Sequence, residues 1–167
     1  MDHSTTHTSA NQRTGEMYLP GVKTMREHVF VSELASWWQK AHPGDFSGDL
    51  FLETEVPYLN LARAQCDLVI ATGQTTQPEW EIEVKNLALV GNNGKTNDYG
   101  PAKMLSPYLK DRSLIHDIYK MRDFGIASNK AVIGYAFEYD FDTCETAALQ
   151  HPDKLEFINN LKKVCKL

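Results

Sequence analysis

Two short segments joined by a turn-forming stretch constrain the fold of this chain more than any other feature. Residues 65–72 (QCDLVIAT) and 79–86 (EWEIEVKN) are rich in β-branched side chains or alternate between apolar and polar ones, as β-strands do. The stretch 73–78 between them has the glycine, threonine and proline content of a hairpin loop. We therefore expect an antiparallel hairpin centred near positions 75 to 76, and a centre of 75 corresponds to paired residue numbers that sum to 150.

This register places Asp67 directly opposite Glu83. Lys85 lies two residues after Glu83 and therefore shares its face, because strand side chains alternate between the two faces. Direct partners are about 4.5–5.5 Å apart at Cβ, which lets two carboxylates share one divalent cation. A cation beside an ammonium group suits phosphodiester hydrolysis, since both neutralise charge on the phosphate and the cation activates water. A polar strand face in water is the ordinary alternative.

The other face of the hairpin is expected to be apolar. Its side chains on the two strands are Cys66, Leu68, Ile70, Trp80, Ile82 and Val84. Glu81 shares the face of Glu83, where we expect an ordinary solvated strand residue or a reserve site residue.

A helix is predicted over residues 24–41, ended by His42-Pro43-Gly44. Its apolar stripe has helical spacing and consists of Phe30, Leu34, Trp37, Trp38 and Ala41. On a helical wheel Glu27 falls within this stripe and Glu33 on its margin. A carboxylate on the buried side needs a partner or a metal, although one near a helix start can also interact with the helix dipole. Glu27 is therefore a candidate site residue, with Glu33 and Glu55 as open alternatives.

Five further segments complete the expected order of elements. Residues 49–56 form a strand closed by Pro57, and the Gly- and Asn-rich residues 87–109 form a long surface loop that flanks the site. A helix runs from Asp111 or Ser113 to about Asp123. A fourth, central strand spans 130–139, and a last helix covers about 153–165. The inward side chains of the helix near 111–123 are expected to be Leu114, Ile118 and Met121.

Composition indicates one globular domain over residues 17–167, preceded by a disordered tail at 1–16. The chain has 167 residues, of which 42% are apolar and 23% charged. No apolar run approaches the roughly 18–20 residues of a membrane span, so we expect no membrane association. There is no leader pattern, and the three cysteines form no CxxC pair. These features favour a cytoplasmic protein with reduced thiols.

The charge is unevenly distributed. The net charge of -5 argues against nucleic acid as a partner. Residues 85–130, however, carry eight Lys or Arg against four Asp, a net charge of +4. A local basic surface on an acidic body is therefore compatible with the sequence, and so is an ordinary mixed-charge surface.

The arrangement Glu27…Asp67…Glu83-Val84-Lys85 within an α-β-β-β-α-β order resembles the PD-(D/E)XK nuclease superfamily, over about residues 24–140. The resemblance implies a restriction-endonuclease-like α/β fold, with a mixed four-stranded sheet flanked by helices and here a C-terminal helix. It also implies Mg²⁺, or Mn²⁺ in its place, bound at Asp67, Glu83 and Val84. Lys85 would assist the attacking water and Glu27 would join the site. Cys66 departs from the family pattern, which has proline before the Asp.

The same resemblance implies contacts to DNA. The family uses the helix after the loop near its substrate, which makes Lys120 the leading phosphate contact, with Arg112 as a further candidate. Arg63, just before the second strand, is another candidate from its position, with an ordinary surface arginine as the alternative. A solvated helix face is the alternative for Arg112, His116 and Lys120, which form one polar stripe.

The implied activity is that of a Mg²⁺-dependent deoxyribonuclease, an endonuclease rather than an exonuclease. A homodimer would suit the cutting of both strands of a duplex. Two alternatives remain. One is a catalytically silent module of the same fold that binds nucleic acid or protein in a larger defence or repair assembly. The other is an acidic protein in which these residues are placed by chance.

Overall fold

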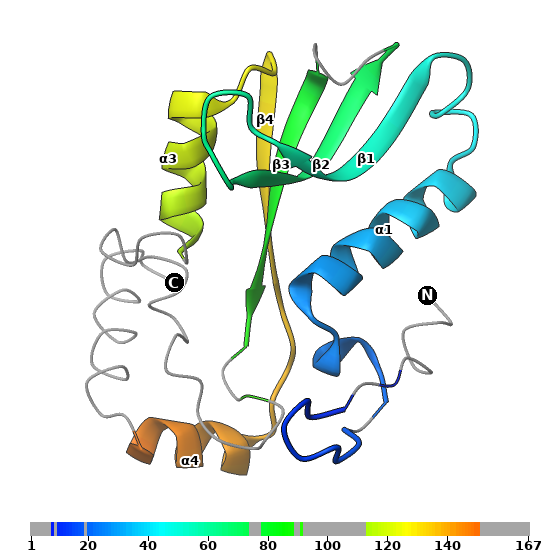
Figure 1. The fold of residues 1–167 in the computed structure, drawn as a ribbon. Coiled ribbons are helices and arrows are strands. Elements are labelled where there is room, and N and C mark those ends of the chain that lie inside the picture. Colours follow the sequence, from blue (N-terminus) through cyan, green and yellow to red (C-terminus); the bar gives the residue numbers. More distant parts are fainter. Residues whose placement is uncertain are drawn as a thin grey trace. The chain divides into compact units, whose positions relative to one another are not determined.

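The computed structural model of the chain describes residues 8, 10–18, 20–73, 78–88, 91 and 113–150 (Figure 1). The chain divides into two compact units, Met1–Lys85 with Asp117–Gly134, and Asn86–His116 with Tyr135–Leu167. Most of the expected loop at 87–109 and all of the expected helix at 153–165 lie outside the described residues.

The elements follow the predicted α-β-β-β-α-β order. They are α1 (Glu27–Ala41), β1 (Leu50–Pro57), β2 (Gln65–Thr72), β3 (Pro78–Leu87), α3 (Leu114–Phe124) and β4 (Asn129–Ala136), with a 3₁₀ turn at Val22–Thr24 before α1. The strand predicted at 65–72 has the predicted bounds, and the other elements begin and end within three residues of their predicted positions.

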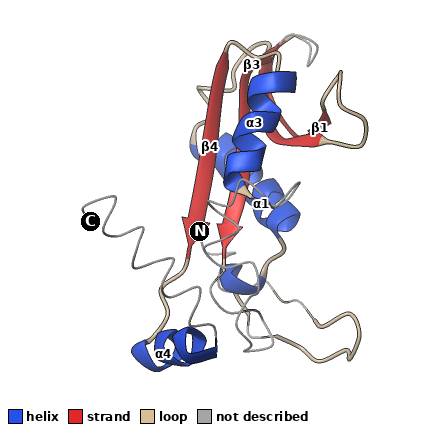
Figure 2. Ribbon diagram, turned by 90° about the vertical axis from the view of Figure 1, so that its left-hand side faces the viewer, coloured by secondary structure: helices blue, strands red, loops and turns tan. Residues whose placement is uncertain are grey.

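The strands form one four-stranded sheet in the order β1-β2-β3-β4. The first three strands form an antiparallel meander. β4 points the same way as β3 in Figure 2, so the sheet is mixed. β4 lies at the edge, and the expectation that it is central is therefore wrong. The reason is topological: β1, β2 and β3 pair in sequence, so a fourth strand can join only at an edge, here the free edge of β3.

The β2–β3 register is the predicted one. Leu68 pairs with Ile82, Val69 with Glu81 and Ile70 with Trp80, so the residue numbers sum to 150. The pairing shifts between Ile70 and Ala71, beside the connection to β3. Continued by one residue in the other direction, the same register brings Asp67 opposite Glu83.

Helix α1 packs on β1 and β2. Its buried side chains are Phe30, Val31 and Ala35, whereas Trp37 is exposed. The predicted stripe through Trp37 and Ala41 is therefore wrong by about one position. Val31 and Ala35 are small and let the helix lie close to the sheet. Trp37 instead makes an edge contact with His42 just beyond the helix end.

A core cluster on the face of the sheet next to α3 contains Tyr58, Cys66, Val69, Ala71 and Met121. Cys66 thus packs with Val69, and its expected place beside Leu68 is wrong. β2 is irregular between Cys66 and Leu68, because the β1–β2 pairing skips Asp67 together with Glu55, whose φ of 56° is left-handed, and the β2–β3 pairing begins only at Leu68. A strand interrupted in this way loses its strict alternation.

Helix α3 turns a different set of residues inward from the one expected. Met121 is buried as predicted, but Ile118 is exposed and Asp117 is buried in its place. An apolar pattern does not indicate which charged side chains are buried with a partner. Asp117 has two such partners, Lys85 and Lys120.

Helix α4 (Phe141–Gln150), in the second unit, is an element that the sequence patterns did not indicate. Its start carries a recognisable signal, because Asp140 accepts the N–H of Thr143 at 2.7 Å as a helix cap. In the expected N-terminal tail, Ala10 and Met17 form an isolated β-bridge. None of the helices in the described part of the chain has the length and apolar character needed to cross a membrane.

Candidate active site on the buried face of β3

Three charged side chains in a row on one face of β3 are buried. Glu81, Glu83 and Lys85 are 4%, 1% and 7% exposed. The expectation that Glu81 is solvated is therefore wrong, and this face is not a polar strand face in water. Ile82 and Val84 on the other face are buried too, because β3 lies inside the sheet with packing on both sides. Buried charges require partners, so each of these groups has to be accounted for.

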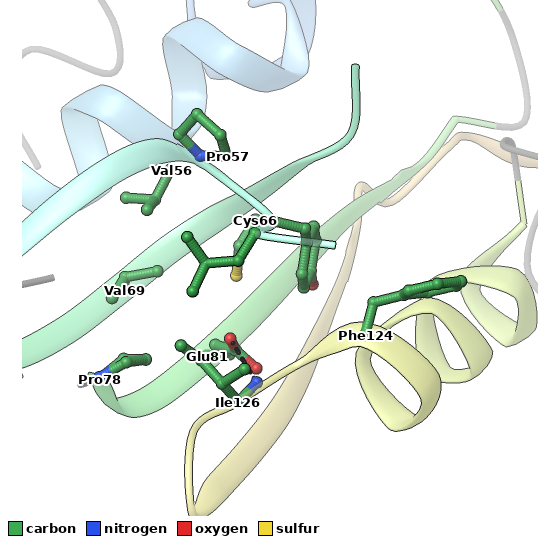
Figure 3. A pocket seen from close by; sticks show the side chains of 10 residues that line it. Val56, Pro57, Cys66, Val69, Pro78, Glu81, Phe124 and Ile126 are labelled. Carbon is green, nitrogen blue, oxygen red and sulfur yellow. Dashed lines mark hydrogen bonds between the residues drawn. The ribbon is translucent and has the colours of Figure 1, made fainter. Parts of the chain in front are cut away.

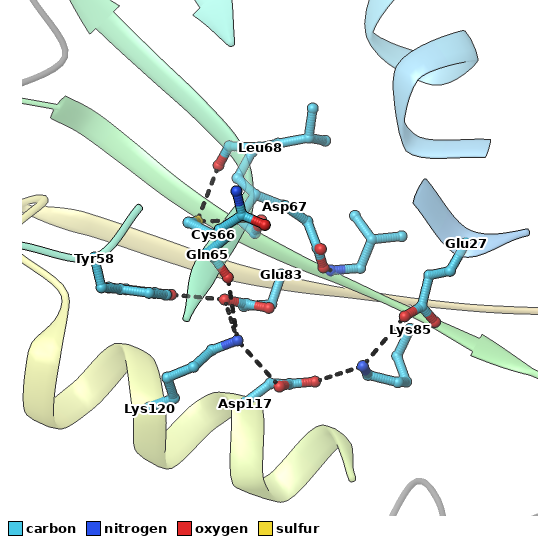
Figure 4. Close-up of polar contacts among 12 residues, drawn as sticks. Glu27, Tyr58, Gln65, Cys66, Asp67, Leu68, Glu83, Lys85, Asp117 and Lys120 are labelled. Atoms are coloured by element: carbon cyan, nitrogen blue, oxygen red, sulfur yellow. Dashed lines mark hydrogen bonds and ion pairs between the residues drawn. The ribbon is translucent and has the colours of Figure 1, made fainter. Parts of the chain in front are cut away.

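Glu83 contacts one residue just after β1 and one residue of α3. Its Oε1 accepts the hydroxyl of Tyr58 at 2.6 Å and lies 2.9 Å from the ammonium of Lys120 (Figure 4). Burial, with a smaller contribution from the nearby Asp67, raises the pKa of Glu83 to about 8, against the attraction of Lys120. The ionised form of this carboxyl is thus understabilised by its surroundings.

Asp67 is tied to the backbone of β3. Its Oδ2 accepts the N–H of Val84 at 2.7 Å, just past the last regular β2–β3 pair. Burial raises the pKa of Asp67, and the charge of Glu27 adds to the shift, while the Val84 hydrogen bond and Lys85 oppose it. Val84 thus meets Asp67 through its N–H. A metal contact through the Val84 carbonyl oxygen stays a prediction.

Lys85 reaches out from β3 to two carboxylates. Its ammonium lies 2.9 Å from Oδ2 of Asp117 on α3 and 3.4 Å from Oε1 of Glu27 on α1. Burial alone would lower the pKa of Lys85, but these carboxylates outweigh it and raise the pKa, so the group stays an ammonium. Glu27 therefore faces the buried charges, while Glu33 and Glu55 are exposed.

Asp117 is the site residue that the sequence patterns missed. It lies between two lysines, with Oδ2 on Lys85 and Oδ1 3.3 Å from Lys120. Figure 4 shows the result, a chain of alternating groups that runs Tyr58, Glu83, Lys120, Asp117, Lys85, Glu27. We call these six residues the charge chain. The Asp117–Lys120 spacing of three residues on one helix is the signal that could have indicated the pair.

The three expected DNA contacts lie in different surroundings. The Lys120 ammonium is engaged with Glu83, Asp117 and the carbonyl oxygen of Gln65, so a phosphate contact would require it to leave Glu83. Arg63 is exposed in the turn between β1 and β2, with a left-handed φ of 64°. Arg112 lies outside the described residues.

The donor set of the site suits a hard cation. No group of three or more His, Cys, Asp or Glu side chains forms a metal site within the described ranges. Mg²⁺ does not need one, because it keeps several waters and is commonly held by one or two carboxylates together with substrate phosphates. Asp67 and Glu83 provide two such carboxylates, both with raised pKa values.

Comparison with known proteins adds no relative: no protein-family model, curated protein sequence or solved structure matches this chain. Its function is therefore inferred from the chemistry of the buried face of β3.

Proposed function

We propose that this chain is a metal-dependent nuclease of the PD-(D/E)XK type that hydrolyses phosphodiester bonds in DNA. The observation that carries the proposal is the β2–β3 pairing, which keeps the predicted sum of 150 as far as Leu68–Ile82. Asp67, the next residue of β2, accepts the N–H of Val84 and so lies beside Glu83 and Lys85. These three groups are buried or partly buried, and Glu27 contacts the last of them. Charged groups in a dry site act on a substrate far more strongly than the same groups in water.

Asp67 and Glu83 would hold the Mg²⁺ ion, with Val84 as a further contact and Mn²⁺ as a substitute. When bound, the ion supplies an activated water and positive charge beside the phosphate. The raised pKa values of both carboxyls support this assignment, because they show that the surrounding groups compensate the ionised form, which a cation would bind, only in part. A cation that prefers oxygen ligands gains the most at such a place.

Lys85 and Lys120 have separate tasks in this proposal. Lys85 remains protonated between Asp117 and Glu27, where its charge supports the phosphate as negative charge develops. Lys120 neutralises Glu83 in the absence of other cations. Once Glu83 has another positive partner, Lys120 is free to turn to a phosphate oxygen, as expected for the leading phosphate contact.

A second candidate is a catalytically silent module of the same fold that binds nucleic acid or protein, alone, as a homodimer or within a defence or repair assembly. The charge chain favours this candidate in one respect. Lys120 and Lys85 already neutralise the carboxylates of Glu83 and Asp117, as they would in a purely structural network.

A cleavage assay separates the two candidates. Supercoiled plasmid, linear duplex and single-stranded DNA are incubated with the chain and Mg²⁺, Mn²⁺ or a chelator. We expect metal-dependent nicking of the closed plasmid, which only an endonuclease can produce. Asp67→Asn and Glu83→Gln should abolish it. Glu53→Gln removes the same charge from the exposed side of β1 and should leave it unchanged.

Circular dichroism first checks that the wild type and each variant are folded, so that a loss of cleavage reports on the site. Retention of DNA without cleavage of any substrate, with either metal, supports the silent module. Cleavage that survives both site substitutions would overturn the assignment of Asp67 and Glu83.

A further inference from the structure

A cavity of about 210 Å³ lies on the side of the sheet next to α3, within the first unit. Its inner walls include Val56, Val69 and Phe124 (Figure 3). Leu59 and Ile126 also line it and are exposed, so they form an apolar mouth open to solvent. The cavity is separate from the charge chain except at Tyr58, which lines it and belongs to both.

Glu81 is the one charged residue among the cavity-lining side chains of the described chain. Figure 3 shows its carboxylate in the middle of the lining, with Val69 and Pro78 on one side and Phe124 on the other. Oε1 accepts the N–H of Ile126 at 3.0 Å. Oε2 is buried and has no hydrogen-bond partner within the described part of the chain. A buried acceptor without a partner is costly, and such a group often awaits a ligand.

Nearby cations do not compensate this oxygen. The ammonium of Lys130 donates to the carbonyl oxygen of Gly125 at 3.0 Å, and no ion pair to Glu81 is formed by the described residues. Gly125 has the residue type that this placement requires. A Cβ at that position would lie 2.2 Å from Oε2 of Glu81 and 2.4 Å from the backbone oxygen of Met121, so only glycine fits there beside the carboxylate.

We propose that the cavity binds a small organic cation, an ammonium group on an apolar body about the size of one aromatic ring. The apolar walls favour the body, and Oε2 of Glu81 is the acceptor for the ammonium. The size also fits: an engineered apolar cavity of about 150 Å³ holds benzene, so this cavity has room for a ring and a short arm. The aromatic rings of Tyr58 and Phe124 add further attraction for a cation.

Benzylamine is the probe that tests this proposal, with benzyl alcohol as a neutral control and phenylacetate as an anionic one. Each is titrated into the full ¹⁵N-labelled chain while backbone amide resonances are followed. The Ile126 amide reports on the site, because its partner is the other oxygen of the same carboxylate. We expect saturable shifts at Ile126 and Gly125 with benzylamine, binding about tenfold weaker with benzyl alcohol, and none with phenylacetate.

Glu81→Gln tests the role of the charge and should weaken benzylamine binding by about tenfold. Glu53→Gln removes a charge of the same sign outside the cavity and should bind as the wild type does, which controls for attraction to the acidic surface. Equal affinity for amine and alcohol, unchanged binding by Glu81→Gln, or no shift at Ile126 would each overturn the proposal. If Glu81→Gln fails to fold, the three probes on the wild-type chain still decide.

Discussion

The carboxylate of Asp67 accepts the backbone N–H of Val84 at 2.7 Å, across 17 residues of chain. The side chain of one strand thus takes the place of a backbone acceptor for its neighbour, at the point where the regular pairing ends. Asp67 therefore supports the hairpin itself, in addition to any part that it has in binding a cation.

This contact predicts different stabilities for two Asp67 variants. Asp67→Ala leaves the N–H of the fully buried Val84 without its acceptor and should lower the free energy of unfolding by about 1–3 kcal/mol. Asp67→Asn keeps an acceptor oxygen and should cost less. Urea unfolding of both variants measures the difference. Equal stability of the two would show that the hydrogen bond contributes nothing.

Removal of Lys85 should destabilise the fold, independently of any effect on activity. Lys85→Met takes the nearer ammonium from Asp117, whose side chain is only 5% exposed. Loss of one partner of a buried pair costs roughly 3–5 kcal/mol. Lys40→Met, at the exposed end of α1, is the matched control and should change stability by less than about 0.5 kcal/mol. Similar thermal melting of both variants would contradict the buried pairing.

Because of Glu83, we expect the free energy of unfolding to fall as pH rises. Its pKa is about 8 in the folded chain and near the ordinary 4.5 when unfolded, so between these values the folded form holds a proton that the unfolded form has lost. The stabilisation that this proton gives is complete below pH 4.5 and is lost by about pH 8. Between these values the free energy of unfolding falls by up to about 1.4 kcal/mol per pH unit. Glu83→Gln should remove this slope. Urea unfolding from pH 5 to 9 tests it, and parallel curves for both proteins would contradict it.

Cys66 should be unreactive in the folded chain. Burial, together with the nearby Glu83, raises the pKa of its thiol to about 12, so almost no thiolate exists at pH 8. Iodoacetamide treatment followed by mass spectrometry of the Cys66 peptide should show modification in urea and little without it. Rapid alkylation of the native chain would mean that the strand around Cys66 opens readily.

The sequence predicts the hairpin well because two independent features specify it. The strand patterns and the short stretch between them place the centre of pairing near positions 75 to 76, and an Asp67–Glu83 pair requires the centre at 75, which is the one observed. No comparable signal marks the interruption of the β1–β2 pairing at Glu55 and Asp67, and for this reason the packing of Cys66 beside Val69 was not predicted.

The rest of the site depends on contacts between segments far apart in the chain. Asp117 has the polarity of a surface residue, and only the lysines from β3 and from its own helix make its burial favourable. Glu81 is similar, because the glycine that makes room for it follows α3. Sequence periodicity indicates which apolar side chains are buried, but it does not indicate which charged side chains are buried beside a compensating partner.

The position of α3 in the chain has a consequence for folding kinetics. The hairpin of β2 and β3 is local and can form early, but it carries four acidic residues, Asp67, Glu79, Glu81 and Glu83, against the single charge of Lys85. Lys120 and Asp117 arrive only when α3 docks, after a long connection. Until then the acidic side chains repel one another in water. Added salt screens this repulsion, so it should speed refolding more than it changes the rate of unfolding.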